Sequence, residues 1–163
     1  MKVSVWYFAY GSNMDLARLE TARLIPEGLQ VKERVLGYVE GWQLVFNKPW
    51  SKFSGGGAAN IMPHDSDHVY GTLNLMDARG LDVLDHYEGV AGGHYLRAPL
   101  RVHRPAFGDT VEAVVYLAQG VADAPLIPPR FYLDHLLAGR DLLPPDYVTR
   151  LEAFATLPIF SEL

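Results

Sequence analysis

The stretch YFAYGSNM, residues 7–14, carries the most informative pattern in this chain. Residues 3–10 alternate in type and are rich in valine and aromatic side chains, which predicts a strand. Helical spacing of apolar side chains begins after Gly11, at Met14, Leu16, Ala17 and Leu19. We expect Gly11 to adopt a φ angle closed to other residues, and Ser12 or Asn13 to cap the helix.

The backbone of this turn predicts a site for negative charge. Successive N–H groups ahead of a helix point in one direction and stabilise an anion. The turn over residues 10–13 therefore predicts an oxyanion hole. Many strand–turn–helix junctions share this pattern and have no function, so a purely structural turn is the alternative.

The composition restricts the class of protein and of partner. The 163 residues are 49% hydrophobic, as in an ordinary soluble domain, and we expect one domain over residues 1–163. No apolar run approaches the roughly 18 residues of a membrane span, so we expect a cytoplasmic protein without a membrane partner. The absence of cysteine excludes disulfides, thiolate metal sites and cysteine catalysis. The net charge of −5 and the scattered basic residues argue against a nucleic-acid partner.

The middle of the chain predicts strands. Residues 29–47 are expected to be extended, in short runs that break at Gly37 and Gly41. A loop with three consecutive glycines follows at 48–57. A polar turn at 63–68 is expected to join the next two strands. The further strands are expected at 58–62, 69–76, 94–103 and 110–118, the last two forming a hairpin around Gly108 and Asp109.

Helices are expected at three further places, which makes the fold α+β and largely antiparallel. Asp77 is expected to cap a short helix over residues 78–87. Pro128-Pro129 and Pro144-Pro145 each open a helix near the C-terminus. Within the first of these helices, apolar residues recur at spacings that suit packing, and Gly139 ends it.

The stretch LDVLDHYEGVAGGHY, residues 81–95, contains a carboxylate that suits acid–base chemistry. Glu88 lies where the helix must end, because Gly89 follows it. Apolar neighbours would desolvate the Glu88 carboxylate and raise its pKa toward the range of a general base. A solvated glutamate at a helix end is the alternative. Asp82 and Asp85 are expected on the outer, solvated face of the helix.

Four motifs in the observed order resemble the γ-glutamylcyclotransferase family. They are YFAYGSNM (7–14), VYGTLNLM (69–76), LDHYEGVAGGHY (84–95) and PPRFY (128–132), and the resemblance runs from about Val5 to Leu157. Because YGSN is retained and Met14 follows it, the chain is similar to the branch that acts on γ-glutamyl-amino acids and related amides.

The resemblance implies a fold, a reaction and a set of site residues. The implied fold is a small mixed, largely antiparallel β-barrel with peripheral helices, and no metal or organic cofactor is expected. The implied reaction cyclises a small γ-glutamyl substrate and releases 5-oxoproline with an amine or amino acid. Glu88 is implied to be the catalytic acid and base. The implied substrate-binding residues are Tyr7, Phe8, Ala9, Tyr10, Gly11, Ser12, Asn13, Tyr95 and Tyr132.

Other interpretations of these residues remain open at this point. Ser12 could be a nucleophile with His86 and Asp85 as partners, although the flanking residues do not form G-x-S-x-G. A cluster in the polar turn could bind a metal or be solvated loop: His64, Asp65, Asp67 and His68. Tyr87 and Tyr116 are expected to pack structurally. A non-catalytic small-molecule-binding or interaction domain of the same fold is the alternative function.

The leaving amine and the oligomeric state are the least constrained properties. The 48–57 loop, with Trp50 and Phe53, and the segment 119–129 are expected to shape the site of the amine. That segment holds no charged cradle beyond Asp123 and the adjoining Arg130, so we expect a small or apolar amine. The C-terminal PIFSEL, with Ile159, Phe160 and Leu163, could pack on its own domain or on a neighbour, so monomer and homodimer are both open.

Overall fold

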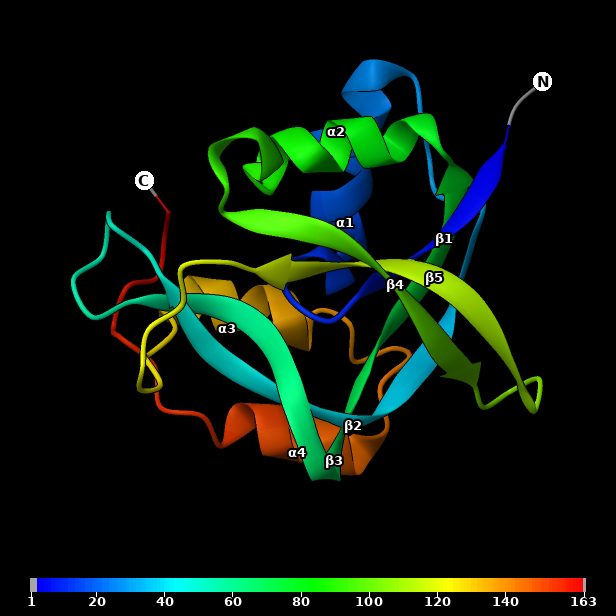
Figure 1. Cartoon of the computed structure of the whole chain (residues 1–163). Coiled ribbons are helices and arrows are strands. Elements are labelled where there is room, and N and C mark those ends of the chain that lie inside the picture. Colours follow the sequence, from blue (N-terminus) through cyan, green and yellow to red (C-terminus); the bar gives the residue numbers. More distant parts are fainter. Residues whose placement is uncertain (1–2, 163) are drawn as a thin grey trace.

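A closed barrel forms the centre of the computed structural model, which describes residues 3–162 (Figure 1). Within this range the strand order around the barrel is β1-β3-β2-β4-β5. Among the described strands, β1 and β5 pair in parallel, and the other pairs are antiparallel. The predicted mixed, largely antiparallel barrel is therefore confirmed. The strands are β1 (Ser4–Ala9), β2 (Glu33–Pro49), β3 (Gly57–Asp77), β4 (Tyr95–Arg104) and β5 (Asp109–Ala118).

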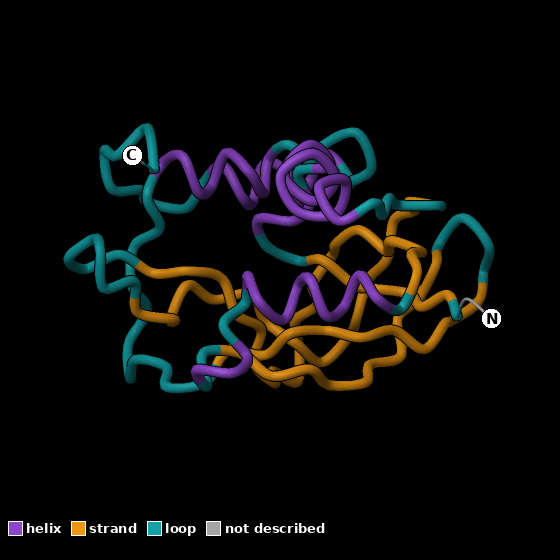
Figure 2. The backbone as a smooth tube through the Cα atoms, turned by 90° about the horizontal axis from the view of Figure 1, so that it is seen from above, coloured by secondary structure: helices purple, strands orange, loops and turns teal. Residues whose placement is uncertain are grey.

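The α-helices lie outside the barrel (Figure 2). They are α1 (Leu16–Leu19), α2 (Arg79–Tyr87), α3 (Arg130–Leu137) and α4 (Pro145–Glu152). As predicted, Pro129 and Pro144 precede the first turns of α3 and α4. The Asp77 carboxylate accepts a hydrogen bond from the Arg79 N–H at 2.9 Å, at the start of α2. Among the described residues, no helix combines the length and apolar character needed to cross a membrane.

Strand β2 is continuous, so the predicted breaks at Gly37 and Gly41 are wrong. A Cβ atom at Gly37 would lie 2.8 Å from Val102 Cγ1 and 2.9 Å from Leu73 Cγ. These two core side chains leave no room for a side chain at position 37, which explains the glycine without a break in the strand. Gly41 has a φ of +82° and lies where the register between β2 and β3 shifts. It bends the strand without ending it.

Strand β3 is likewise continuous, and the polar turn predicted at residues 63–68 is a bulge within it. Trp42 of β2 pairs with Pro63 and Glu40 pairs with His68, so residues 64–67 lie opposite Gly41 alone. The bulge is held by an ion pair in which Arg150 donates to Asp67 at 2.6 and 2.9 Å. These hydrogen bonds lower the pKa of Asp67 to about 2.

The junction after β1 differs from the prediction in its cap and in the geometry of Gly11. Neither Ser12 nor Asn13 caps the helix. Asp15 is the cap of α1, because its side chain accepts hydrogen bonds from the N–H groups of Ala17 and Arg18. Gly11 has a φ of −116°, which other residues adopt readily. After α1 the chain continues through a π-helical segment, Glu20–Leu24.

One joint of the barrel and the C-terminal segment complete the fold. The described pairing between β2 and β4 consists of Tyr38 with His103, whose rings stack with centroids 4.7 Å apart. Ile159 packs against the core, and its carbonyl accepts from the Phe131 N–H at 3.0 Å. Phe160 is 74% exposed, and Leu163 lies outside the described residues.

Replacing Gly71 by alanine should destabilise the barrel by about 1–3 kcal/mol or more. A Cβ atom there would lie 2.4 Å from the Ala9 carbonyl oxygen and 2.8 Å from Phe8 Cε1, so β1 and β3 would have to separate. Urea denaturation measures the change. Gly92→Ala is the control, because its Cβ would meet only the exposed His94 side chain, at 3.3 Å or more. Equal stability of the two variants would contradict this account of β1–β3 packing.

Candidate active site

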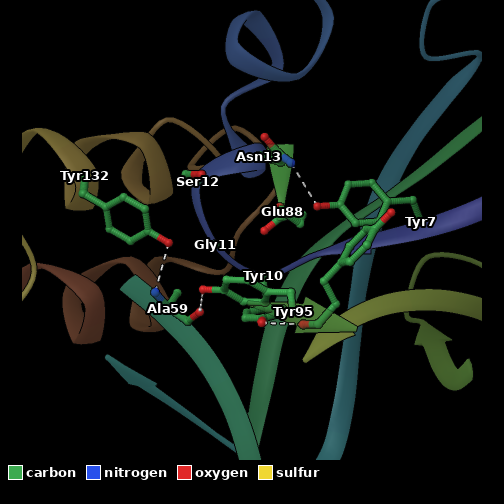
Figure 3. Close-up of a pocket in the computed structure, with 10 residues that line it drawn as sticks. Tyr7, Tyr10, Gly11, Ser12, Asn13, Ala59, Glu88, Tyr95 and Tyr132 are labelled. Atoms are coloured by element: carbon green, nitrogen blue, oxygen red, sulfur yellow. Dashed lines mark hydrogen bonds between the residues drawn. The ribbon is translucent and has the colours of Figure 1, made fainter. Parts of the chain in front are cut away.

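A small inner cavity lies where the end of β1, the end of α2 and the mouth of the barrel meet (Figure 3). Most of the predicted site residues line it: Tyr7, the loop residues 10–13, Glu88, Tyr95 and Tyr132. Ala59 and Tyr116 complete the lining. The cavity volume is about 40 Å³, on a measure in which one water needs roughly 10–15 Å³. A group of a few heavy atoms therefore fits.

Phe8 and Ala9 do not line this cavity, unlike the other residues proposed to bind substrate. Neighbouring strand residues point to opposite faces, and the Phe8 side chain is fully buried in the core. Ala9 pairs with Thr72 of β3, and only 1% of it is exposed. Both residues build the strand that carries the loop and contribute no surface to the cavity.

Glu88 lies at the C-terminus of α2, as its sequence context predicts. Its N–H donates to the Leu84 carbonyl at 2.8 Å, and Gly89 ends the helix with a φ of +65°. Only 18% of the Glu88 side chain is exposed. Burial raises the pKa of the Glu88 carboxyl above its ordinary 4.5, and the positive charges of Arg23 and Arg18 offset part of this rise. The carboxylate points into the cavity (Figure 3).

Arg23 is a functional candidate that sequence reasoning missed. Its side chain is 10% exposed, and Nη1 lies 4.0 Å from Glu88 Oε1. The guanidinium also lies over the Tyr87 ring, 4.7 Å from the ring centre. Arg23 belongs to the π-helical segment Glu20–Leu24. Because a π turn changes the direction of side chains relative to an α-helix, regular helical periodicity could not have identified this arginine.

The loop after β1 supplies unused backbone donors to the cavity wall. Its 3₁₀ turn is closed by hydrogen bonds from the Met14 and Asp15 N–H groups to the carbonyls of Gly11 and Ser12. Within residues 3–162, the N–H groups of residues 11, 12 and 13 donate no hydrogen bond. A Cβ atom on Gly11 would lie 3.3 Å from Ala59 Cβ and 3.5 Å from Tyr132 Oη, so a side chain there would crowd the cavity.

Tyrosine hydroxyls tie this wall to the barrel (Figure 3). Tyr132 Oη accepts from the Ala59 N–H at 2.9 Å, and Tyr95 Oη donates to the Ala59 carbonyl at 2.8 Å. Tyr10 Oη donates to the Tyr116 carbonyl at 2.6 Å. Burial raises the pKa of Tyr132 to about 12, so its phenol is neutral at physiological pH.

The amide of Asn13 joins the loop to Tyr7. Asn13 Nδ2 donates to Tyr7 Oη at 3.1 Å. Burial, followed by the negative charge of Glu88, raises the pKa of Tyr7. Asn13 Oδ1 is buried and has no hydrogen-bond partner among the described residues. The hydrogen bond to Tyr7 therefore uses the amide nitrogen of Asn13 and leaves its oxygen without a partner among the described residues.

A larger outer cavity of about 410 Å³ adjoins the inner one. The two cavities share Ser12, Glu88, Tyr95 and Tyr132 in their linings. Cationic side chains on the outer wall are Arg18, Arg23 and Lys48. A third cavity of about 470 Å³ continues along the loop that contains Trp50 and Phe53. The 48–57 loop therefore borders the outer cavities, as predicted, while the charges come mainly from the segment after β1 and from β2.

The structure does not assemble the alternative serine site. Ser12 Oγ accepts from Arg18 Nε at 3.2 Å, and His86 is exposed on α2. Asp85 is not on a solvated face as predicted, because it accepts hydrogen bonds from Arg97 and Tyr116 at 2.6–2.7 Å. Asp82, which is 79% exposed, fits its prediction.

Two other sequence interpretations can be placed in the structure. The residues of the possible metal cluster lie on or beside the bulge of β3, and no group of three or more metal-ligating side chains forms within residues 3–162. Tyr87 is 49% exposed and covers Arg23. Tyr116, predicted to be structural, packs edge-on against Tyr7 and also lines the inner cavity.

Comparisons with known proteins identify related sequences and similar folds. A family model described as the AIG2-like family matches residues 68–151, slightly more than half of the chain. A human protein named gamma-glutamylcyclotransferase is 29% identical over 153 residues, which cover 92% of this chain and 78% of the human protein. A solved structure named gamma-glutamyl cyclotransferase has a TM-score of 0.83 at 23% identity, covering 99% of this chain and 94% of that one. A yeast structure described as a glutathione-specific cyclotransferase has a TM-score of 0.61 at 13% identity, covering 91% and 93%.

Glu88→Gln should raise the free energy of unfolding at pH 7. A buried acid whose pKa is higher in the folded state than in the unfolded state loses stability as the pH rises from the unfolded value through the folded one. Glutamine keeps the shape of the side chain and removes the buried negative charge. The gain should be present at pH 7 and vanish near pH 4, as measured by urea denaturation. A less stable variant at pH 7 would show that the ionised carboxylate is stabilising.

Proposed function

The chain belongs to the AIG2-like family, and we propose that it is a γ-glutamylcyclotransferase. The names of its relatives confirm the resemblance found in the sequence motifs. The proposed substrate is a γ-glutamyl amide, and the proposed products are 5-oxoproline and an amine or amino acid. One observation carries this proposal: a buried carboxylate, Glu88, and three unused backbone N–H groups border the same small cavity.

The two cavities suit the two halves of such a substrate. We assign the reacting end of the γ-glutamyl group to the small inner cavity, because Glu88 and the residues of the 10–13 loop line it. The departing amine carries the variable part of the substrate and would extend into the outer cavity. Glu88 lines both cavities, so it can reach the bond that joins the two halves.

The proposed reaction begins with proton transfer to Glu88. The carboxylate removes a proton from the α-ammonium group of the substrate, and the freed amine attacks the δ-carbonyl carbon. Because the nucleophile belongs to the substrate, ring closure is intramolecular and needs no covalent enzyme intermediate.

The carbonyl oxygen becomes anionic as the C–N bond forms. We assign the N–H groups of the 10–13 loop to this charge, and the loss of one such donor costs about 3–4 kcal/mol in comparable sites. Glu88 then returns its proton to the leaving nitrogen, and the C–N bond to that nitrogen breaks. As the carbonyl re-forms, the ring nitrogen, which still carries two hydrogens, loses one of them to the free Glu88 carboxylate, which passes it to the departing amine, released as an ammonium ion. One carboxylate thus acts as base and then as acid.

Glu88→Gln should reduce 5-oxoproline release by at least about 10²–10⁴-fold, because glutamine cannot accept the ammonium proton. The assay uses γ-glutamyl-amino acids, γ-glutamyl amines and glutathione, with release measured by chromatography. Glu112→Gln, the same substitution on an exposed side chain of β5, is the matched control and should retain activity. Full activity of Glu88→Gln would refute the mechanism. Binding of these compounds by the wild-type protein without cleavage would favour a non-catalytic binding domain.

The pH profile should report the electrostatic contact between Arg23 and Glu88. Base catalysis requires ionised Glu88, so kcat/KM should fall as the pH drops through its raised pKa. Arg23 lowers that pKa, so Arg23→Gln should move the acidic limb of kcat/KM to higher pH. Measuring both proteins with one substrate cancels the titration of the substrate. A limb that stays in place or moves to lower pH would contradict this coupling.

A further inference from the structure

Arg23 is a buried cation whose hydrogen-bonding capacity is unused. Its guanidinium makes no hydrogen bond with any residue that the structure describes, and its contacts are Glu88 at 4.0 Å and the face of the Tyr87 ring. A guanidinium has five N–H donors, and those of Arg23 have no protein acceptor among the described residues while the side chain is only 10% exposed. The Tyr87 ring covers one face and leaves the edge of the guanidinium available. This arrangement is expected where a ligand supplies the acceptors.

The surroundings of Arg23 point to an anionic ligand. Arg23 lines the outer cavity together with Arg18 and Lys48, and not the inner one. Arg18 already contacts Ser12, His135 and Glu162. Lys48 donates to the Gln119 carbonyl and has two further N–H donors. Arg18 uses Nε and Nη1 in these contacts, whereas the whole guanidinium of Arg23 has no hydrogen-bond partner among the described residues. Arg23 and Lys48 therefore offer the larger share of donors without a protein partner on this wall.

We propose that Arg23, assisted by Lys48, binds a carboxylate carried by the leaving amine of the substrate. This inference rests on the proposed function. A guanidinium edge matches the two oxygens of a carboxylate, and the bonds are charge-assisted. The outer cavity receives whatever lies beyond the scissile bond, so an acidic leaving group meets this wall.

This inference predicts a leaving amine that carries a carboxylate, whereas the sequence alone led us to expect a small or apolar amine. The 119–129 segment does contribute uncharged residues, Gly120, Ala122 and Leu126, to the adjoining third cavity. The charge on the outer wall comes instead from residues distant in sequence, in the π-helical segment and in β2. A search for charges within the 119–129 segment could not reveal them.

Two substrates that differ only in the carboxylate test the proposal. γ-Glutamyl-alanine and γ-glutamyl-ethylamide release amines of the same skeleton, with and without a carboxylate. In Arg23→Gln, the ratio of kcat/KM for the alanine substrate to that for the ethylamide should fall by about tenfold or more. Any effect through Glu88 changes both substrates equally and cancels in the ratio. Arg101→Gln, on an exposed arginine of β4, should leave the ratio unchanged.

A second variant and a binding measurement complete the test. Because Arg23 is buried, the folding of Arg23→Gln is verified by circular dichroism. Lys48 is less buried, and Lys48→Met should lower the ratio of kcat/KM for the alanine substrate to that for the ethylamide several-fold. Calorimetry with the Glu88→Gln protein measures binding without turnover. Tighter binding of the alanine compound than of the ethylamide, lost when Arg23→Gln is added, would support the carboxylate site.

Failure of the proposed carboxylate site and failure of the proposed reaction give different results. Equal loss of kcat/KM on both substrates would overturn the inference and leave the proposed function intact, since Arg23 would then act on Glu88 or on the glutamyl half. Absence of 5-oxoproline release by the wild-type protein would overturn the proposed function, while the calorimetric comparison would still decide whether Arg23 recognises the carboxylate. Equal binding of the two compounds by Glu88→Gln would overturn the inference.

Discussion

The barrel closes where β1 lies parallel to β5, and the position of the candidate site depends on that closure. Trp6 pairs with Ala113 and Tyr7 with Val114, so the end of β1 lies beside β5. Gly11, two residues beyond the strand, lies close to Ala59 near the start of β3. The hydroxyl of Tyr10, which lies between the strand and Gly11 in sequence, donates to the Tyr116 carbonyl of β5. Without this pairing, the loop with its unused N–H groups would have no defined place relative to Glu88.

The pKa of Glu88 is set by two opposing effects, burial and the nearby positive charges of Arg23 and Arg18. Burial raises the pKa of Glu88 and favours its protonated form, whereas closer pairing with a cation would lower the pKa and make the carboxylate a weaker base. Arg23 stands at 4.0 Å, near enough to favour the ionised form and too far for a hydrogen bond. Burial and the neighbouring Arg18 also lower the pKa of Arg23. Each charge therefore offsets part of the cost of burying the other.

The parts of the molecule that sequence could predict are those with local causes. Proline placement located α3 and α4, and the helix-ending glycine located Glu88 at the end of α2. The cap was assigned to Ser12 or Asn13 because they follow the strand directly. The intervening 3₁₀ turn moved the helix start to Asp15. Gly37 suggested a break, but its smallness reflects contacts with Val102 and Leu73, which are distant in sequence. Arg23 could not be predicted from sequence either, because a π turn and contacts with residues distant in sequence place it beside Glu88.

The sparse pairing between β2 and β4 has a consequence for how the molecule fluctuates. Other neighbouring antiparallel strands share long ladders, whereas this joint is described by Tyr38 and His103 and by the stacking of their rings. Sub-global opening starts where the fewest cooperative bonds must break together. We therefore expect transient separation of the barrel to begin along this seam, while the β1–β3 ladder that leads into the loop holds six residue pairs. In this way β2 and β4 could separate transiently while β1 and β3 keep the 10–13 loop in position beside Glu88.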